Sequence, residues 1–373
     1  MAHTFPVPID EFLAAAGPIL DVRSPGEFEQ GHIPSAIALP LFTNEERAQV
    51  GTCYKQQSRE QAIELGFDLV GPKLGELIRQ AKALAPERTV RIHCWRGGMR
   101  SSAIAWALNL AGFHTTTLQG GYKAFRQWVR STLSISKEII LLGGMTGTAK
   151  TDILHALAAQ GEQVLDLEGH ASHRGSSFGA LCLPSQPSTE QFENILAIKW
   201  QQFVSDRPIW IEAESRRVGA CRVPAELFDQ MEAAVAIEIT RPVSERVALL
   251  VDIYGQAASE DLIAATERIR KRLGGQRTQA AIAAIQTGDL ATAVSITLDY
   301  YDRTYRYGLE QRDHPVLEVD VTGLLPDSAA TQLREARVHL QKTKSHKTQE
   351  KRLQIPQSPA KRESLSLVAK TAS

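Results

Sequence analysis

A thiol flanked by arginines and glycines is the strongest chemical signal in this chain. Residues 94–101 read Cys-Trp-Arg-Gly-Gly-Met-Arg-Ser, between a short buried strand expected over 89–93 and an apolar helix expected over 101–110. A cysteine between a strand end and a helix start faces backbone N–H groups that have no partner. Those donors and the helix dipole favour a negative charge, so we expect the thiol of Cys94 to ionise below its ordinary pKa.

The rest of this loop suits an anion on or near the sulfur. Arg96 and Arg100 add positive charge. Gly97 and Gly98 are expected to let the backbone curl around the sulfur without a Cβ in the way. The predicted anion-holding loop therefore consists of Arg96, Gly97, Gly98, Met99, Arg100 and Ser101.

A second chemical signal lies at 144–151. An apolar strand runs into Gly144-x4-Ala149-Lys150-Thr151, and a helix through Ala159 follows. This is the strand–loop–helix setting of a P-loop. Ala149 stands where the pattern has glycine, and we expect it to take helical angles that keep phosphate binding at the helix N-terminus. The predicted diphosphate ligands are Gly144, Thr146, Gly147, Lys150 and Thr151.

Two further segments of the same half end in acidic side chains. The strands expected over 163–168 and 208–214 each finish with two carboxylates. Either pair suits the acid that lies close to the metal in P-loop enzymes, and either pair suits a group that orients a loop. The residue types alone leave both alternatives open.

Each of these strands is followed by a polar, basic loop that contains glycine, at 169–179 and 215–219. Both loops leave the expected carboxyl edge of a parallel sheet, where α/β proteins build their sites. The candidate nucleic-acid or substrate residues there are His173, Arg174, Ser176, Ser177, Arg216 and Arg217.

A later stretch, 300–307, interleaves tyrosines with Arg303 and Arg306. That composition suits stacking on bases and binding phosphates. It equally suits a helix that packs its tyrosines on the core and leaves its arginines in water. Both alternatives stay open.

The composition is that of a soluble globular protein. The 373 residues are 43% hydrophobic and 23% charged, with zero net charge, so any nucleic-acid site must be a local patch. No apolar run approaches the length of a membrane span, and the N-terminus lacks the features of a signal peptide. The four cysteines are scattered without a CxxC pair, which disfavours zinc sites. We therefore expect a cytoplasmic protein without a metal site.

Strands alternate with helices over most of the chain, which predicts an α/β fold with parallel sheets. We expect a first domain over 1–132 and a P-loop domain with a helical extension over 133–340. The segment 341–373 holds eight Lys/Arg and two Asp/Glu, and we expect a basic, disordered tail. Cys53 falls between two expected helices, and an auxiliary role is predicted for it.

Three motifs in the first domain resemble a rhodanese-like domain. They are Asp-Val-Arg-Ser-Pro-Gly-Glu-Phe-Glu-Gln-Gly-His-Ile-Pro-Ser-Ala at 21–36, Cys94 with its loop, and Leu-Gln-Gly-Gly-Tyr at 118–122. Cys94 and Arg100 form a C-x5-R loop, one residue longer than the usual sulfurtransferase loop. That length also suits a phosphatase of the same fold, in which cysteine attacks phosphorus and arginine clamps the phosphate.

The whole chain resembles the tRNA 2-selenouridine synthase family. The resemblance rests on 94–101, on Val-Gly-Thr-Cys-Tyr-Lys at 50–55, on His-Arg-Gly-Ser-Ser-Phe-Gly at 173–179 and on Glu-Ser-Arg-Arg-Val-Gly at 214–219. These four motifs occur in the family's order, and the resemblance extends over roughly 5–325.

The resemblance implies a tRNA-modifying enzyme that replaces the sulfur of wobble 2-thiouridine with selenium. Selenophosphate and geranyl diphosphate would be co-substrates, S-geranyl-2-thiouridine the intermediate, and no cofactor would be tightly bound. The expected partners are the tRNAs for Lys, Glu and Gln and a selenophosphate-producing enzyme. Cys94 would take up selenium as a selenosulfide. A tRNA sulfurtransferase and a rhodanese-fold phosphatase without selenium chemistry remain as alternatives.

Overall fold

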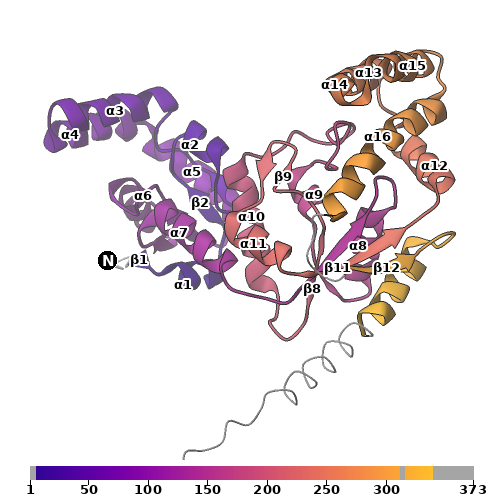
Figure 1. Cartoon of the computed structure of the whole chain (residues 1–373). Helices are drawn as coiled ribbons and strands as arrows, with labels where there is room; N and C mark the ends of the chain where they lie inside the picture. Colours follow the sequence, from indigo (N-terminus) through magenta and orange to yellow (C-terminus); the bar gives the residue numbers. More distant parts are fainter. Residues whose placement is uncertain (1–5, 311–315, 339–373) are drawn as a thin grey trace, which may run out of the picture.

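The computed structural model describes residues 6–310 and 316–338, without the side chains of 306–310. Two five-stranded parallel sheets lie side by side, each covered by helices (Figure 1). In the second sheet, β6 and β8 are buried on both faces, which explains why their sequences are nearly continuous apolar runs. The expected α/β class is therefore confirmed.

The first sheet has the order β1-β5-β4-β2-β3. Its strands are β1 (Pro6–Val7), β2 (Ile19–Asp21), β3 (Ile37–Ala38), β4 (Thr89–His93) and β5 (His114–Leu118). The helices around it are α1 (Ile9–Ala14), α2 (Pro25–Gln30), α3 (Asn44–Gln56), α4 (Arg59–Val70), α5 (Leu74–Leu84), α6 (Met99–Leu110) and α7 (Gly121–Leu133), with a 3-10 turn, η1 (Gly71–Lys73). Because β4 is the central strand, the loop after it lies in the middle of the sheet's carboxyl edge.

The second sheet has the order β12-β11-β6-β8-β7. Its strands are β6 (Ile139–Gly144), β7 (Gln163–Leu165), β8 (Ile209–Glu212), β11 (Val235–Thr240) and β12 (Val316–Asp320), and a short ribbon joins β9 (Arg217–Val218) to β10 (Cys221–Arg222). Its helices are α8 (Lys150–Ala159), α9 (Leu167–Ala171), α10 (Thr189–Gln202), α11 (Ala225–Glu232) and a helix over 326–338. Again the central strand, β6, leads into the candidate loop.

A helical extension follows β11. It consists of α12 (Val243–Tyr254), α13 (Ser259–Arg268), α14 (Arg270–Leu273), α15 (Gly275–Gln286) and α16 (Leu290–Glu310). These helices have their own apolar cluster, which includes Leu250, Leu262, Ile285 and Leu298. The long helix α16 returns to the P-loop sheet, and α13, α14 and α15 project away from it (Figure 1).

Helices α7 and α10 join the two domains through one apolar cluster. Phe125 and Val129 of α7 belong to the same buried cluster as Phe192, Leu196 and Trp200 of α10. Interfaces between domains of one chain are ordinarily smaller and more polar. The shared cluster therefore fixes the two sheets as neighbours.

Polar contacts reinforce this interface. The buried Asn194 side chain donates to the hydroxyl of Tyr122 at 2.8 Å and to the carbonyl of His32 at 2.9 Å. Glu190 accepts from the same tyrosine hydroxyl at 2.8 Å.

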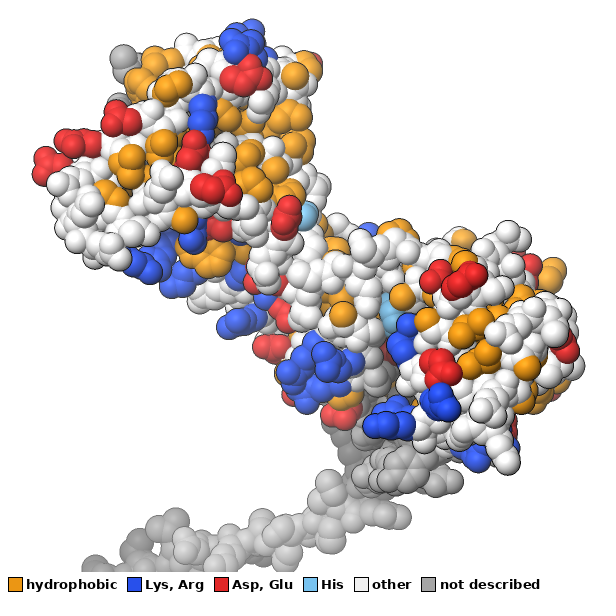
Figure 2. Space-filling view, turned by 90° about the horizontal axis from the view of Figure 1, so that it is seen from above, with side chains coloured by type: hydrophobic (Ala, Val, Ile, Leu, Met, Phe, Trp, Pro, Cys, Tyr) orange, Lys and Arg blue, Asp and Glu red, His pale blue; other side chains and the backbone are white. Residues whose placement is uncertain are grey.

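Seen from above, basic side chains gather where the two lobes meet (Figure 2).

Several expectations about single elements were wrong. Cys53 lies inside α3, not between helices, because Thr43 caps a helix that runs through it. The strand expected over 163–168 ends at Leu165, and Glu168 lies in α9, which Asp166 caps. The two domains are joined between the end of α7 at Leu133 and the start of β6 at Ile139. The expected tail, 341–373, lies outside the described residues. None of the helices in the described ranges is long and apolar enough to cross a membrane.

Candidate functional site

Cys94 lies at the end of β4, and the residue is only 3% exposed. Its Sγ atom is 3.3 Å from the hydroxyl oxygen of Ser101, which also lies 3.0 Å from the carbonyl oxygen of Gly98. Burial alone would raise the pKa of the Cys94 thiol. Hydrogen bonds from the side chain and backbone of Ser101, the charge of Arg100 and the backbone N–H of Arg96 outweigh burial and lower that pKa below its ordinary value.

The two loop arginines have different surroundings. The Arg100 guanidinium donates to Glu27 at 2.7 Å, and Arg47 lies 3.8 Å from the same carboxylate. Burial would raise the pKa of Glu27, but the bond and charge of Arg100 lower it, so Glu27 is ionised at neutral pH. Arg96 is exposed to solvent. Only Arg100 is therefore held beside the sulfur by a side-chain contact.

Of the two loop glycines, only Gly97 has a backbone conformation that requires glycine. Its φ is +65°, and a Cβ there would lie 2.5 Å from the carbonyl oxygen of Leu118. Gly98 has a negative φ, and a Cβ there would meet nothing within 4 Å. Gly97 is therefore needed for the approach of the loop to the backbone after β5, and Gly98 is not needed for space.

The start of α7 fixes the loop from behind. The backbone N–H of Tyr122 donates to the carbonyl of Cys94 at 2.8 Å, and a Cβ on Gly121 would lie 2.4 Å from that oxygen. Arg23 is fully buried, pairs with Asp21 at 2.6 Å, and lies 3.8 Å from the centroid of the Tyr122 ring. The ion pair at the end of β2 therefore orients the cysteine loop through Tyr122.

The P-loop connects β6 to α8. The Lys150 ammonium donates to the carbonyl of Gly144 at 2.6 Å, so it is folded back over its own loop. Ala149 has φ +67° and ψ +31°, the left-handed region, and the right-handed helical angles expected for it were wrong. An L-residue with a Cβ is strained there by about 1–2 kcal/mol. The P-loop therefore keeps this backbone conformation although alanine disfavours left-handed angles.

Residues far along the chain hold the P-loop in this shape. The Gly144 N–H donates to the Tyr305 hydroxyl at 2.7 Å, and that hydroxyl donates to Glu238 at 2.7 Å. The buried Arg246 donates to the carbonyl of Thr146 at 2.8 Å and pairs with Asp302 at 2.5 Å. Sequence analysis assigned none of these four side chains to the P-loop, because only the fold brings β11, α12 and α16 beside the loop.

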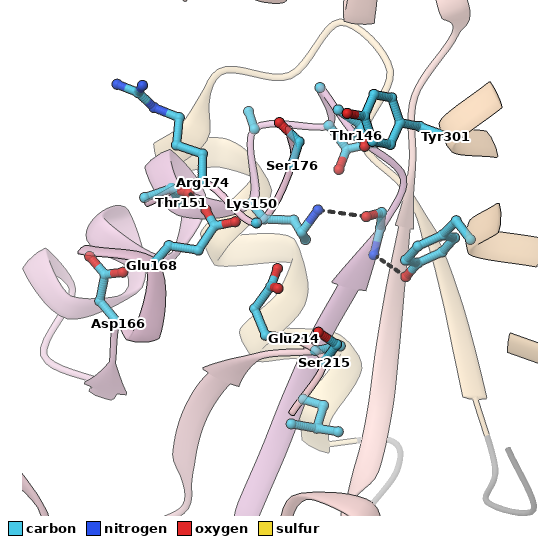
Figure 3. A pocket seen from close by; sticks show the side chains of 18 of the residues that line it. Thr146, Lys150, Thr151, Asp166, Glu168, Arg174, Ser176, Glu214, Ser215 and Tyr301 are labelled. Carbon is cyan, nitrogen blue, oxygen red and sulfur yellow. Dashed lines mark hydrogen bonds between the residues drawn. The ribbon is translucent and has the colours of Figure 1, made fainter. Parts of the chain in front are cut away.

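Three carboxylates, Glu168, Glu212 and Glu214, lie close to the P-loop. Glu168 accepts from the Thr151 hydroxyl at 3.1 Å, and its backbone N–H donates to Glu212 at 2.8 Å. A Cβ on Gly175 would lie 3.0 Å from oxygens of both Glu168 and Glu214. Thus Glu212, fully enclosed, orients a backbone, whereas Glu168 and Glu214 face the loop (Figure 3). Burial, and then the charge of Glu214, raises the pKa of Glu168 to about 8.

The loop with His-Arg-Gly-Ser-Ser-Phe-Gly folds around its histidine. His173 is 9% exposed, and a Cβ on Gly179 or Gly219 would lie under 3 Å from its ring. Arg174 donates to the carbonyl of Leu181 at 2.9 Å and points away from Lys150 (Figure 3).

Beyond the arginine, the serines of this loop take separate roles. Ser176 lines the cavity, whereas the backbone N–H of Ser177 donates to the Tyr301 hydroxyl at 3.0 Å. In the other loop, Arg216 and Arg217 are exposed, and the Arg216 guanidinium lies 5.6 Å from the Phe228 ring centroid.

The aromatic stretch of α16 packs inward. Tyr301 and Tyr305 line the P-loop cavity, whereas Arg303 is exposed and pairs with Asp299 at 2.8 Å on its own helix. The structure therefore favours tyrosines on the core over tyrosines free to stack on bases. The side chain of Arg306 lies outside the described residues.

The P-loop opens into a cavity of about 1030 Å³. One part is polar and includes the predicted ligands Gly144, Thr146, Gly147, Lys150 and Thr151 (Figure 3). Another part is apolar and includes Leu183, Phe228, Met231, Leu249, Leu250 and Ile253. The described lining comes from the second domain, so the cavity and the Cys94 loop are separate sites. No cluster of ligands that could hold a metal ion occurs among the residues that the structure describes.

These two sites define the class of protein. A reactive-cysteine loop on a rhodanese-like sheet is joined in one chain to a P-loop cavity on a second sheet. Residues 9–128 match the rhodanese-like domain profile, and residues 137–323 match the profile of the tRNA 2-selenouridine synthase AAA domain. The chain belongs to the tRNA 2-selenouridine synthase family.

Full-length relatives agree with this assignment. The tRNA 2-selenouridine synthase of Pseudomonas fluorescens is 35% identical, over 79% of this chain and 89% of its own. That of Proteus mirabilis is 36% identical, over 83% of this chain and 93% of its own. Among solved structures, the tRNA isopentenylpyrophosphate transferase of Bacillus halodurans is 10% identical, with a TM-score of 0.34, over 57% of this chain and 100% of its own.

Proposed function

We propose that this enzyme converts wobble 2-thiouridine in tRNA to 2-selenouridine in two steps, at two sites of one chain. The observation that carries the proposal is the pairing of an ionisable thiol in an anion-holding loop with a separate P-loop cavity that has an apolar wall. The relatives' name supports the tRNA substrate and the selenouridine product. The expected substrates are the tRNAs for Lys, Glu and Gln.

In the proposed first step, the P-loop cavity binds geranyl diphosphate. Lys150 and the backbone N–H groups at the start of α8 would hold the diphosphate, because these donors favour phosphate oxygens. Phe228, Met231 and Leu249 offer an apolar surface to the geranyl chain. The thiouridine sulfur attacks the first carbon of the chain, the carbon–oxygen bond breaks, and diphosphate leaves.

In the proposed second step, selenium replaces the alkylated sulfur. A sulfur that carries an alkyl group leaves C2 as a neutral thiol, which is a better leaving group than the free sulfur anion. Selenophosphate would supply the selenium at the Cys94 loop, where Arg100, Ser101 and the loop amides favour an anion. A selenophosphate-producing enzyme is the proposed partner that delivers this donor.

The deciding experiment is mass spectrometry of nucleosides from the tRNA of a strain that lacks the gene. Loss of 2-selenouridine with 2-thiouridine retained supports the proposal. In vitro, purified protein with 2-thiouridine tRNA and geranyl diphosphate should form S-geranyl-2-thiouridine, and selenophosphate should then convert it. Loading with thiosulfate in place of selenophosphate, and formation of 2-thiouridine from uridine, would instead identify a sulfurtransferase.

A further inference from the structure

The Cys94 loop has the length and contacts of a loop that binds a phosphoryl group. Five residues separate Cys94 from Arg100, and Ser101 follows at once. The Ser101 hydroxyl lies 3.3 Å from Sγ, where it can stabilise the thiolate both before attack and when the thiolate leaves again. Helix α6 begins at Met99, so the N–H groups of its first turn have no partners within the helix. These first-turn N–H groups, the Ser101 hydroxyl and Arg100 are donors that suit a tetrahedral group with three oxygens.

Arginine suits this loop because its planar fork matches two oxygens of a phosphoryl group. Arg100 is held in place by Glu27 at 2.7 Å, and its charge lowers the pKa of the thiol. Glu27 therefore fixes the guanidinium, whose charge acts on the thiol, before any ligand binds.

The oxidation states of selenium and phosphorus distinguish two routes for the release of selenium. Selenophosphate carries selenium already at the selenide level, bonded to pentavalent phosphorus. If the thiolate of Cys94 attacked selenium, the expected selenosulfide would form only with reduction of phosphorus to the phosphite level, or with an added oxidant. Attack on phosphorus needs neither.

We propose that Cys94 attacks the phosphorus of selenophosphate. The sulfur–phosphorus bond forms, the phosphorus–selenium bond breaks, and its electron pair leaves with selenium as the hydrogen selenide ion, HSe⁻, whose proton comes from the singly protonated selenophosphate itself. Water then hydrolyses the phosphocysteine to phosphate and restores the thiolate. The selenide attacks C2 of the geranylated base, and geranylthiol leaves. The inference rests on the proposed function for its donor, and it assigns Cys94 to dephosphorylation instead of selenium storage.

The groups that face Cys94 fit this leaving group. His93 is fully buried, and burial lowers its pKa to about 4, so it is neutral at pH 7. Glu27 is ionised beside Arg100. Neither His93 nor Glu27 is therefore a proton donor at neutral pH. An ester oxygen would need a general acid to leave, whereas hydrogen selenide leaves as a stable anion with the proton that selenophosphate already carries.

The test uses doubly labelled selenophosphate and the full-length protein without tRNA. Selenophosphate carrying phosphorus-32 and selenium-75 is mixed with protein, and the reaction is stopped within milliseconds by an alkaline denaturant. We expect phosphorus-32 on Cys94 and selenium-75 in solution. Selenium-75 on the protein overturns the inference, and so does the absence of both labels from a preparation that selenates tRNA.

Variants sharpen the result. Cys94→Ser should lose the label, and Cys182→Ser, which removes an exposed cysteine outside the loop, should keep it. Ser101→Ala should slow the loss of label roughly 10–100-fold, because one hydrogen bond to the departing thiolate is lost. Unchanged label lifetime in Ser101→Ala would contradict the loop's role. If the protein accepts the phosphorus label but never selenates geranylated tRNA, the proposed function fails and this inference stands.

Discussion

The two sites differ in how much of the chain is needed to build them. The Cys94 loop is made from consecutive residues, with α7 and the Asp21–Arg23 pair behind it. The lining of the P-loop cavity is drawn from Leu141 to Val316. A site for a small anion can be local, because a few amides and one charge satisfy it. The cavity that we propose for a diphosphate with a long apolar chain is assembled from several elements.

Cys94→Ser should separate the two sites most completely. We expect no 2-selenouridine and continued geranylation, because the P-loop cavity does not include the thiol. S-geranyl-2-thiouridine should accumulate, and nucleoside mass spectrometry measures it. If geranylation stops as well in a folded variant, the sites are not independent.

Lys150→Ala should produce the reverse pattern. The ammonium would neutralise charge that grows on the leaving diphosphate, and loss of such a group typically costs about 10²–10³ in rate. Single-turnover geranylation should fall by that factor, and selenation of pre-geranylated tRNA should be unchanged. An equal loss of both steps would point to a shared role, such as binding a tRNA phosphate.

Arg246→Gln should show that the P-loop site depends on distant support. The change removes the buried Arg246 and leaves the half-buried Asp302 without its partner; breaking a buried pair typically costs about 3–5 kcal/mol of unfolding free energy, which is an upper bound here. The matched control is Arg277→Gln, which breaks an exposed pair with Asp299 and should cost about 0–1 kcal/mol. Urea denaturation followed by tryptophan fluorescence compares them. Equal losses of unfolding free energy in the two variants would show that Arg246 does not support the P-loop.

A pH titration should distinguish the cavity from the cysteine loop. Burial raises the pKa of Glu168 to about 8, so the group is mostly neutral at pH 7 and gains a negative charge as pH rises through 8. Pyrophosphate should therefore bind more weakly at pH 9 than at pH 7, as measured by calorimetry. Glu168→Gln should flatten that dependence. If the affinity of the wild-type protein for pyrophosphate rises between pH 7 and pH 9, the predicted role of Glu168 is contradicted.

Ala149→Gly should have the smallest effect. Glycine adopts left-handed angles without the Cβ clash, so the variant should gain roughly 1 kcal/mol of local stability, less the greater chain entropy of glycine. The melting temperature should rise slightly and pyrophosphate affinity should not fall. A lower melting temperature would mean that the Cβ of Ala149 makes a stabilising contact.

The sequence predicted the Cys94–Ser101 loop between a strand and a helix, because these residues are neighbours in the chain. It did not predict the contacts of Glu27 and Tyr122 with the loop, which come from distant elements. It also predicted the position of the P-loop. It could not find Arg246, Asp302, Glu238 and Tyr305, since residues 56–161 positions apart meet there. The handedness of Ala149 was missed because backbone angles imposed by tertiary contacts override local preference.

The apolar cluster shared by α7 and α10 has a consequence for how such a chain can change over generations. A substitution of Phe125 or Val129 alters the packing of Phe192 and Trp200 in the other domain. The two halves therefore accept mutations at this boundary only in matched pairs. Dividing the gene between residues 133 and 139 would leave each product with an exposed hydrophobic surface. The two domains are therefore expected to stay encoded by one gene.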